Sequence, residues 1–189
     1  MRTKTVTLYT FDELSEKAKE KARDEARTDG NDLYGWHDDN AQSLKAFAEF
    51  VSGKADYSVS PWAFSSASIK IDGYITIWVE EEKDYISFGM SELTGENLYN
   101  WLSGDVDKIT ECCPFTGYCM DEDLLDPMRE YLAKSDRDDP RTLQDLVDNG
   151  CERWLKAYIA DWEYQYTDEA IDDFLIANEY EFTEDGEIN

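Results

Sequence analysis

The strongest helical pattern of the chain lies near its C-terminus and requires a partner layer to pack against. Apolar residues recur at helical spacing from Pro140 to about Tyr166, with Pro140 in the first helical position and Asp139 as the N-cap. The inward residues are Leu143, Leu146, Val147, Cys151, Trp154, Leu155, Tyr158, Ile159, Trp162 and Tyr166. The sequence therefore predicts a helix whose broad apolar side is buried in a core.

The N-terminal third is predicted to hold a strand and two helices. Residues 3–9 alternate apolar side chains with threonine, and a helix follows with Asp12 or Ser15 as its N-cap. The inward stripe of this helix is narrow and made of small residues, Leu14, Ala18, Ala22 and Ala26, which favours close packing against a neighbour. A second helix over about 32–52 should turn inward Leu33, Trp36, Leu44, Phe47, Ala48 and Val51.

The pattern changes to short β-type runs between Ala55 and Met90, with turn residues at Asp72–Gly73 and at 82–84, and this predicts an antiparallel meander. Helices are expected again over 93–102 and 121–134. Thr167 can cap a short helix, and a last strand is expected near 179–182.

These elements predict an α+β fold in which a small antiparallel sheet packs with several helices and the C-terminal half is helical and acidic. We expect a single domain over residues 1–189, because no linker is long enough to divide it. Residues 1–90 would form an α/β-meander part, and residues 91–189 a mainly helical, strongly acidic part.

Negative charge dominates the composition and is unevenly distributed. The chain has 44 Asp and Glu against 18 Lys and Arg, a net charge of −26. Residues 91–189 hold 27 of the acidic residues and 7 of the basic ones, whereas aromatic residues, at 14%, are too frequent for a disordered acidic tail. Such a field attracts cationic surfaces and repels nucleic acid and anionic lipid, so we expect no direct binding of nucleic acid or membrane.

The acidic residues can be interpreted as an arranged surface. Carboxylates one helical turn apart differ by about 6 Å along the axis, a spacing of the same order as that of phosphates along a DNA strand. The candidate partner-binding residues on this hypothesis are Asp121, Glu122, Asp123, Asp145, Asp148, Glu152, Asp168, Glu169, Asp172 and Asp173. The alternative is that the acids form an ordinary solvated surface that keeps the protein soluble.

The cysteines form one cluster, Cys112, Cys113 and Cys119, with Cys151 farther along the chain. Their spacing does not match the paired knuckles of zinc sites, so no metal site is predicted and a structural metal is the less favoured alternative. On the favoured interpretation, the thiols pack as small hydrophobic groups around a tight turn.

No catalytic residue is predicted. His37, the only histidine, stands beside Asp38 and Asp39 and is interpreted as a surface residue. Nucleotide-binding loops and nucleophile motifs are absent from the sequence, so we expect no cofactor and no enzymatic activity.

The sequence predicts a cytoplasmic protein. No apolar run reaches the length of about 18 residues that spans a membrane, and the opening MRTKTVTLYTF lacks the apolar core of a signal peptide. Four clustered cysteines do not suggest a disulfide framework, so reduced thiols are expected.

Three segments resemble a family of small, mostly uncharacterised proteins encoded by bacteriophages and prophages, some of them labelled antitoxin-like. The segments are TVTLYTFDELSEKAKEKARDEAR, CPFTGYCMDEDLLDP and ADWEYQYTDEAIDDFLIANEYEFTEDG. The resemblance implies a phage accessory protein in the cytoplasm of the host cell, and it implies no defined activity or catalytic residues. One departure from uniformly acidic DNA mimics is the mixed charge of residues 15–27.

We therefore expect an inhibitor of a host defence enzyme, of the anti-CRISPR or anti-restriction type, that acts as an acidic nucleic-acid mimic. Its partner would be a host nucleic-acid-binding protein with a basic surface. The alternative is an antitoxin-like or phage–host adaptor protein that binds through an apolar patch, to which Tyr34, Trp36, Trp62, Phe64 and Trp101 could contribute. The oligomeric state stays open.

Overall fold

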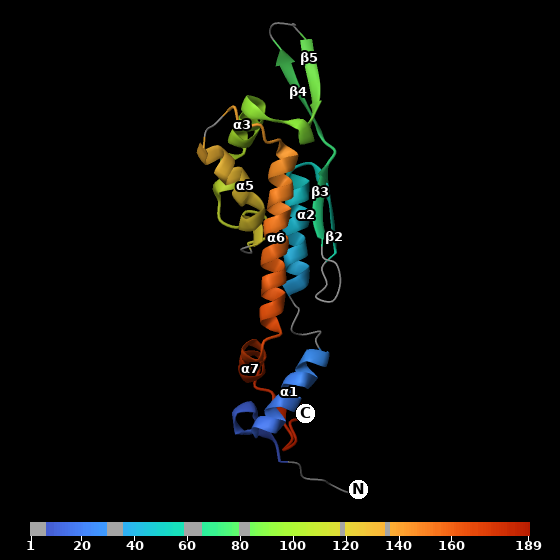
Figure 1. Cartoon of the computed structure of the whole chain (residues 1–189), viewed down its shortest axis with the longest axis vertical. Helices are drawn as coiled ribbons and strands as arrows, with labels where there is room; N and C mark the ends of the chain where they lie inside the picture. The colour runs from blue at the N-terminus through green and yellow to red at the C-terminus, as the bar shows by residue number, and fades with distance from the viewer. Residues whose placement is uncertain (1–6, 30–35, 59–65, 80–83, 118–119, 135–136) are drawn as a thin grey trace. The chain divides into compact units, whose positions relative to one another are not determined.

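A computed structural model of the chain has seven α-helices and three two-stranded antiparallel sheets among its described residues, which confirms the predicted α+β class (Figure 1). The structure describes residues 7–29, 36–58, 66–79, 84–117, 120–134 and 137–189.

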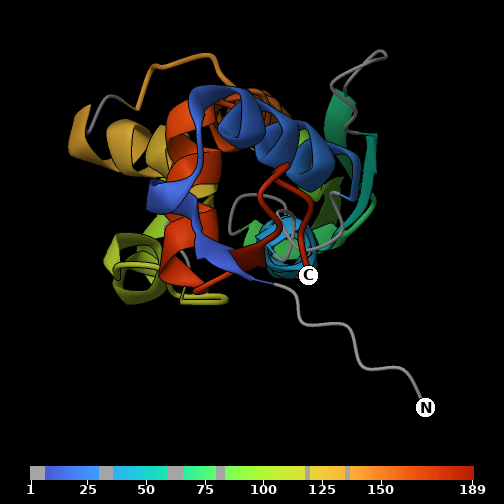
Figure 2. The same ribbon diagram turned by 90° about the horizontal axis from the view of Figure 1, so that it is seen from below.

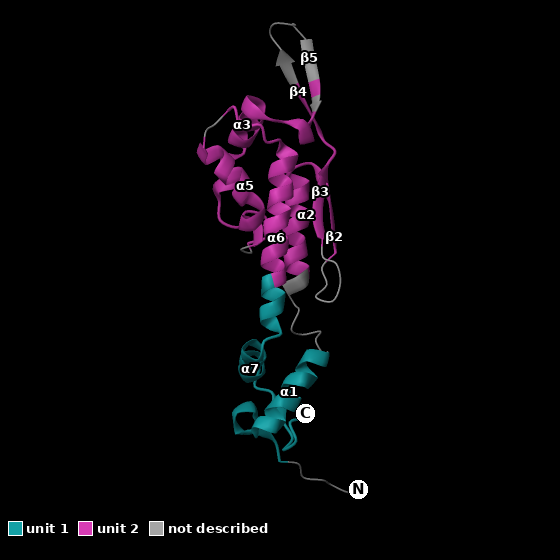
Figure 3. Cartoon of the chain, viewed as in Figure 1, with its two compact units in different colours: residues 1–35, 160–189 teal, residues 36–159 magenta. Residues whose placement is uncertain are grey.

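The chain divides into two compact units. Unit 1 combines residues 1–35 with residues 160–189, and unit 2 consists of residues 36–159 (Figure 3). This grouping differs from the division at residue 90 that the sequence suggested. The reason is that the N-terminal and C-terminal segments pack on each other, and a pattern read along the chain does not report such a contact.

Unit 1 is built around the close packing of two short helices, α1 (Glu16–Asp29) and α7 (Asp168–Ala177). The small stripe predicted on α1 is confirmed, since Leu14 before the helix and the three alanines within it are buried. The rest of this core comes from Phe11, Ile171, Leu175 and Phe182. Ser15 caps α1 as predicted, with its hydroxyl accepting a hydrogen bond from the Ala18 backbone N–H at 3.3 Å.

A two-residue ladder joins the two ends of unit 1. Strand β1 (Tyr9–Thr10) pairs antiparallel with β6 (Glu181–Phe182), and the turn η1 (Phe11–Glu13) connects β1 to the segment before α1. The predicted first strand falls mostly on residues outside those described. The chain after β6 runs beside α1, as Figures 1 and 2 both show, and the backbone N–H of Ile188 donates to Glu25 at 3.3 Å.

Five helices lie wholly or mainly in unit 2: α2 (Trp36–Phe50), α3 (Gly95–Gly104), α4 (Val106–Thr110), α5 (Met120–Lys134) and α6 (Leu143–Gln165). The sequence predicted all of them except α4. The expected inward residues Leu44, Phe47 and Ala48 of α2, and Val51 directly after it, are buried. Leu33 and the side chain of Trp36 lie outside the described part.

Helix α6 begins three residues later than predicted because its cap is a different residue. Thr142 and Asp145 form a reciprocal pair at the start, in which the Asp145 backbone N–H donates to the Thr142 hydroxyl at 3.2 Å. Asp139, the predicted cap, instead accepts hydrogen bonds from the backbone and guanidinium of Arg141. Six of the ten predicted inward residues are buried on α6, namely Leu143, Leu146, Val147, Cys151, Trp154 and Tyr158. The predicted inward residues Leu155, Ile159 and Trp162 are only half-buried, and Tyr166 lies beyond the end of the helix.

The predicted meander is instead two separate hairpins in the described part of the chain. Strand β2 (Gly53–Ser58) pairs with β3 (Ser66–Ile71), and β4 (Tyr74–Val79) pairs with β5 (Asp84–Gly89). Asp72 and Gly73 connect the two hairpins. The Asp72 backbone N–H donates to the Ser52 carbonyl, and the Met90 backbone N–H donates to the Gly73 carbonyl. Met90 opens the short turn η2 (Met90–Glu92).

Helices α5 and α6 approach each other closely at Gly150. A Cβ atom at this position would lie 2.5 Å from the carbonyl oxygen of Leu124, so the contact needs the absence of a side chain. On the sheet side, Gln144 of α6 donates to the Ile69 carbonyl at 2.7 Å and accepts from the Ile71 N–H at 3.3 Å. The outward side of α6 is thereby held in a fixed orientation within unit 2.

Candidate functional site

The ten acidic residues predicted to bind a partner are divided between the two units. Six lie on α5 and α6 in unit 2: Asp121, Glu122, Asp123, Asp145, Asp148 and Glu152. Four lie on α7 in unit 1: Asp168, Glu169, Asp172 and Asp173. Each group is therefore described by itself.

Asp148 and Glu152 stand one helical turn apart on the outward side of α6, and both are exposed. No ion pair to either carboxylate occurs among the residues that the structure describes. Asp148 accepts one hydrogen bond, from the side-chain amide of Gln144 at 2.8 Å. The two carboxylates are thus open to a cationic partner.

Asp145 is also exposed, but it serves the start of α6. Its carboxylate accepts hydrogen bonds from the Thr142 backbone N–H at 2.8 Å and from the Thr142 hydroxyl at 2.9 Å. The backbone donor first, and then the hydroxyl, hold the pKa of Asp145 below its ordinary value. This residue contributes negative charge but has a structural role of its own.

Asp121 does not belong to the exposed surface, and its prediction as a partner-binding residue is corrected by its burial. Its side chain has 0% exposure. One oxygen accepts from the backbone N–H groups of Phe115 and Thr116, at 2.9 and 2.8 Å, and the other accepts from the Thr116 hydroxyl at 3.0 Å. Asp121 holds the loop before α5.

The next acids of α5 gather around one arginine of α6. Arg153 makes a two-pronged ion pair with Glu130, at 2.9 and 3.0 Å, and lies 3.9 Å from Asp126. Burial, followed by the carboxylates of Asp126 and Glu122, raises the pKa of Asp123, and Arg153 opposes this effect. The negative potential at this end of α5 is therefore only partly neutralised.

Three acids of the C-terminal segment of unit 1 are paired with the basic residues of α1. Arg23 makes two hydrogen bonds of 2.6 Å to Asp172, and Arg27 binds Asp168. Lys21 pairs with Glu187 at 2.8 Å. Glu169 and Asp173 are exposed. The mixed charge of residues 15–27 thus supplies the counter-ions for the acidic C-terminal segment.

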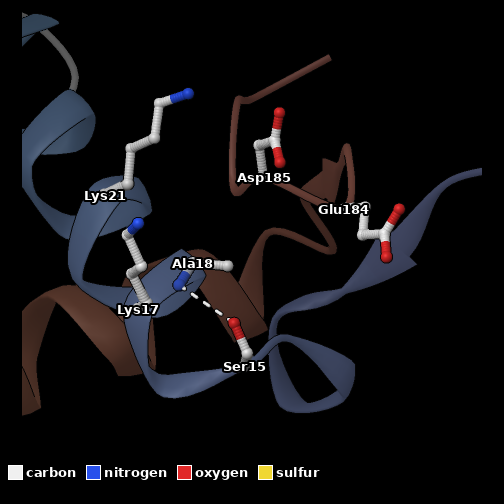
Figure 4. Close-up of a pocket in the computed structure, with 6 residues that line it drawn as sticks. All are labelled: Ser15, Lys17, Ala18, Lys21, Glu184 and Asp185. Carbon is white, nitrogen blue, oxygen red and sulfur yellow. Dashed lines mark hydrogen bonds between the residues drawn. The ribbon is translucent and has the colours of Figure 1, made fainter.

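A pocket of about 270 Å³ in unit 1 has the same mixed character (Figure 4). It is lined by Ser15, Lys17, Ala18 and Lys21 from α1 and the residue before it, and by Glu184 and Asp185 from the C-terminal segment. In Figure 4 the lysines and the carboxylates stand on opposite sides of the opening. Because the basic and acidic groups oppose each other across it, the pocket offers no concentrated charge to an ion.

The cysteine cluster is the densest group of metal-ligating atoms among the described residues. The Sγ atoms of Cys112 and Cys113 are 3.6 Å apart, and Cys112 Sγ lies 3.2 Å from Oε1 of Glu122. One ligand atom from each of these three residues lies within 4.8 Å of the others. The sequence prediction missed Glu122 as a neighbour of the thiols, because Glu122 lies ten positions after Cys112 in the chain and spacing alone does not reveal the contact.

Of the candidate catalytic and metal-binding residues considered in the sequence, Cys119 and His37 fall outside the described side chains. Cys151 is buried on α6, and burial, followed by the charge of Asp148, raises the pKa of its thiol to about 12. This thiol therefore remains protonated and unreactive at neutral pH.

Comparisons with protein-family models, with curated proteins and with solved structures found no match. Among the described residues, no helix combines the length and apolar character that a membrane crossing requires.

Proposed function

We propose that the chain is a phage- or prophage-encoded inhibitor that binds the nucleic-acid-binding surface of a host defence enzyme, of the anti-CRISPR or anti-restriction type. It acts by binding the enzyme and thereby excluding nucleic acid from it, without catalysis. The observation that supports this proposal is the pair Asp148 and Glu152, exposed one turn apart on α6 and free of ion pairs among the described residues. The phage resemblance of three segments supports the biological setting.

The rigidity of α6 favours this use of its acids. The side opposite Asp148 and Glu152 is buried, with Trp154 fully enclosed and Gly150 in direct contact with the α5 backbone. An acid on an ordered helix loses less conformational entropy on binding than an acid on a mobile tail. The two carboxylates are therefore already fixed before binding, in an arrangement that can occupy the phosphate-binding positions of a cationic groove.

The neighbouring α5 extends the negative surface beyond two residues. Glu122 and Asp123 are half-buried at its N-terminal end, and Glu130 is exposed at the far end of the row. Burial first, and then the like charges of Asp126 and Glu122, raise the pKa of Asp123, so carboxylates repel one another here. A cationic side chain from a partner would relieve this repulsion and gain affinity from it.

The proposal places the binding surface in unit 2 and gives α7 a lesser role. Asp168 and Asp172 are already paired with arginines of α1, so a partner would have to displace those ion pairs. Asp148 and Glu152 require no such exchange.

Competition with nucleic acid tests the proposal. A fluorescent DNA or RNA ligand is bound to each of a panel of restriction endonucleases and CRISPR effectors, and the chain is added at low salt. We expect the wild type to displace the ligand from its target enzyme, and the double variant Asp148→Asn/Glu152→Gln to need at least about tenfold more protein, since close charge pairs in interfaces are worth about 1.5 kcal/mol or more.

The matched control removes the same charge elsewhere. Glu169→Gln/Asp173→Asn changes two exposed acids of α7 and leaves the net charge equal to that of the first variant. It should displace the nucleic acid nearly as well as the wild type. Equal losses in the two variants would mean that total charge, and not the α6 surface, governs the inhibition.

The alternative function, an antitoxin-like or adaptor role, has one supporting observation. A pocket of about 420 Å³ in unit 1 has a mixed lining that includes the apolar side chains of Phe11 and Leu175 beside several acids, and Ile176 at this pocket is 46% exposed. Of the aromatic residues predicted for an apolar patch, only Trp101 has a described side chain, and it packs on Phe50 at 5.7 Å. If Ile176→Asp abolished partner binding while Asp148→Asn/Glu152→Gln did not, this alternative would replace the mimic proposal.

A further inference from the structure

We propose that Cys112, Cys113 and Glu122 form a binding site for a thiophilic divalent metal ion of the zinc class. The site lies in unit 2, at the loop that leads into α5; it shares Glu122 with the acidic surface of α5 and does not involve Asp148 or Glu152. The spacing of three ligand atoms and the contacts that hold the loop support it.

The spacing fits one small tetrahedral ion. Two thiolates bound to Zn²⁺ at about 2.3 Å each lie about 3.8 Å apart, and a thiolate and a carboxylate oxygen lie about 3.6 Å apart. The observed separations are 3.6 Å between the two Sγ atoms and 3.2 Å between Cys112 Sγ and Glu122 Oε1. Two edges of the donor triangle are thus close to those of the required tetrahedron, and the third, between Cys113 Sγ and Glu122, is within 4.8 Å.

Ordered contacts hold the loop that carries the thiols. On its C-terminal side, the buried carboxylate of Asp121 binds the backbone of Phe115 and Thr116. On its N-terminal side, the guanidinium of Arg129 donates to the carbonyl oxygens of Ile109 at 2.7 Å and Glu111 at 2.8 Å. Preorganisation of this kind lowers the entropy that metal binding must overcome.

The backbone of Cys113 adds a second observation. Its φ is +50°, in the left-handed region that a residue with a side chain enters at a cost of about 1 kcal/mol or more. Successive side chains of an extended segment point to opposite sides, whereas here the thiols of two successive residues lie together. A strained conformation that brings two metal ligands together is typical of a functional position.

The donor chemistry selects the class of ion. Two thiolates with one carboxylate favour a borderline or soft metal such as Zn²⁺, whereas Ca²⁺ and Mg²⁺ require oxygen ligands. Glu122 supplies the third ligand, and a water molecule can complete the tetrahedron. Because the thiols must lose their protons, binding releases protons and weakens as the pH falls.

Titration of the reduced, metal-free full chain with Co²⁺ tests the site, because cobalt(II) bound by thiolates gives a charge-transfer absorption that carboxylate-bound cobalt lacks. We expect the band to saturate at one ion per chain and to be removed by Zn²⁺ at one equivalent. Cys112→Ser and Glu122→Gln should each weaken the affinity at least about tenfold, as ligand losses do. Cys151→Ser, which removes a buried thiol outside the cluster, should leave both the band and the affinity unchanged.

A second readout covers the case of a variant that folds poorly. In the wild type, Zn²⁺ should protect Cys112 and Cys113 from alkylation, as measured by peptide mass spectrometry, without any substitution. The proposal fails if no thiolate band appears, if Zn²⁺ binds without protecting these two thiols, or if Cys112→Ser binds as tightly as the wild type. The last result would assign the ion to surface carboxylates.

Discussion

Asp121 illustrates how differently the same residue type is used at neighbouring positions. It stands in a run of three acids, Asp121, Glu122 and Asp123, yet only Asp121 is fully buried, with both oxygens bonded to the preceding loop. Glu122 contacts a thiol, and Asp123 is crowded by its neighbours. Sequence reasoning treated the three as equivalent because charge and helix position alone do not report which side chain meets a loop folded back on the helix start.

We expect Asp121→Asn to lower the free energy of unfolding by about 2–3 kcal/mol, because a neutral amide, with one acceptor oxygen in place of two, replaces a charged acceptor of three hydrogen bonds. Urea unfolding followed by tryptophan fluorescence measures the change. Glu152→Gln, an exposed acid on α6, serves as the control and should change stability by less than about 0.5 kcal/mol. Equal stability of the two variants would contradict the structural role of Asp121.

At Asp139, the neighbouring Arg141 stabilises the charge of the carboxylate. The side-chain hydrogen bonds of Arg141, and then its backbone N–H, lower the pKa of Asp139 from 3.8 to about 2. The carboxylate is 12% exposed, so solvent screens this interaction only in part. Because the folded-state pKa is depressed, the stabilisation is complete above about pH 4 and is lost as the pH falls through about 2.

Asp139→Asn should therefore cost up to about 2 kcal/mol of stability at neutral pH, and the difference from the wild type should shrink between about pH 4 and pH 2. Chemical unfolding at a series of pH values gives both curves. A difference that stays constant across this range would show that the Asp139–Arg141 contact acts through geometry and not through charge.

At the scale of elements, periodicity predicted the helices well and the connections poorly. The alanine stripe of α1 and most of the apolar side of α6 are buried as expected, because each pattern repeats over several turns. The caps and the hairpins were less predictable: α6 begins at Leu143, and Asp72–Gly73 joins two hairpins instead of turning one strand onto the next. Those features depend on single hydrogen bonds between residues that are not periodic.

Gly150 is the clearest case of an element-scale constraint that sequence reasoning could not detect. Glycine inside a helix ordinarily costs up to about 1 kcal/mol relative to alanine, so local propensity alone favours a substitution. Here an added Cβ would meet the Leu124 carbonyl at 2.5 Å, and α5 and α6 would have to separate. The neighbouring helix thus overrides the propensity.

Gly150→Ala should lower the free energy of unfolding by about 1–3 kcal/mol, as overpacking does. Gly104→Ala at the end of α3 is the matched control, because no atom lies within 4 Å of its added Cβ, and it should be neutral or slightly stabilising. Thermal unfolding of both variants measures the two changes in stability. A more stable Gly150→Ala protein would contradict the close approach of the two helices.

At the scale of the whole molecule, acidic and basic segments that are far apart in the sequence are brought together by the fold of unit 1. Residues 168–189 contain nine acidic and no basic residues, and α1 supplies the arginines that pair with two of these acids, Asp168 and Asp172. Arg23 and Asp172 are 149 residues apart in the chain, which explains why the net charge of a half could be counted from the sequence but its pairing could not. Of the ten predicted surface acids, Asp121 is thus buried and Asp168 and Asp172 are paired, whereas the others remain on α5 and α6 and, as Glu169 and Asp173, on α7.

The pairing of β1 with β6 also leads to a prediction for unit 1. Phe182 is fully buried between the α1 and α7 segments and packs on Phe11 with ring centroids 5.9 Å apart. Phe182→Ala should destabilise this unit by about 3–5 kcal/mol. Hydrogen exchange should then quicken for amides of α1 and α7 and remain nearly unchanged for α2 and α5, whereas uniform quickening would contradict the division into two compact units.

The salt dependence of partner binding tests the central claim most directly. The chain is used to capture its partner from bacterial lysate at low salt, and the affinity of the purified pair is measured from about 50 mM to about 500 mM NaCl. The account predicts that the affinity falls steeply with salt, and that it falls less steeply for Asp148→Asn/Glu152→Gln, which has fewer charge pairs to screen. An affinity unchanged over this range would contradict the account, because the acidic surface would then play no part in recognition.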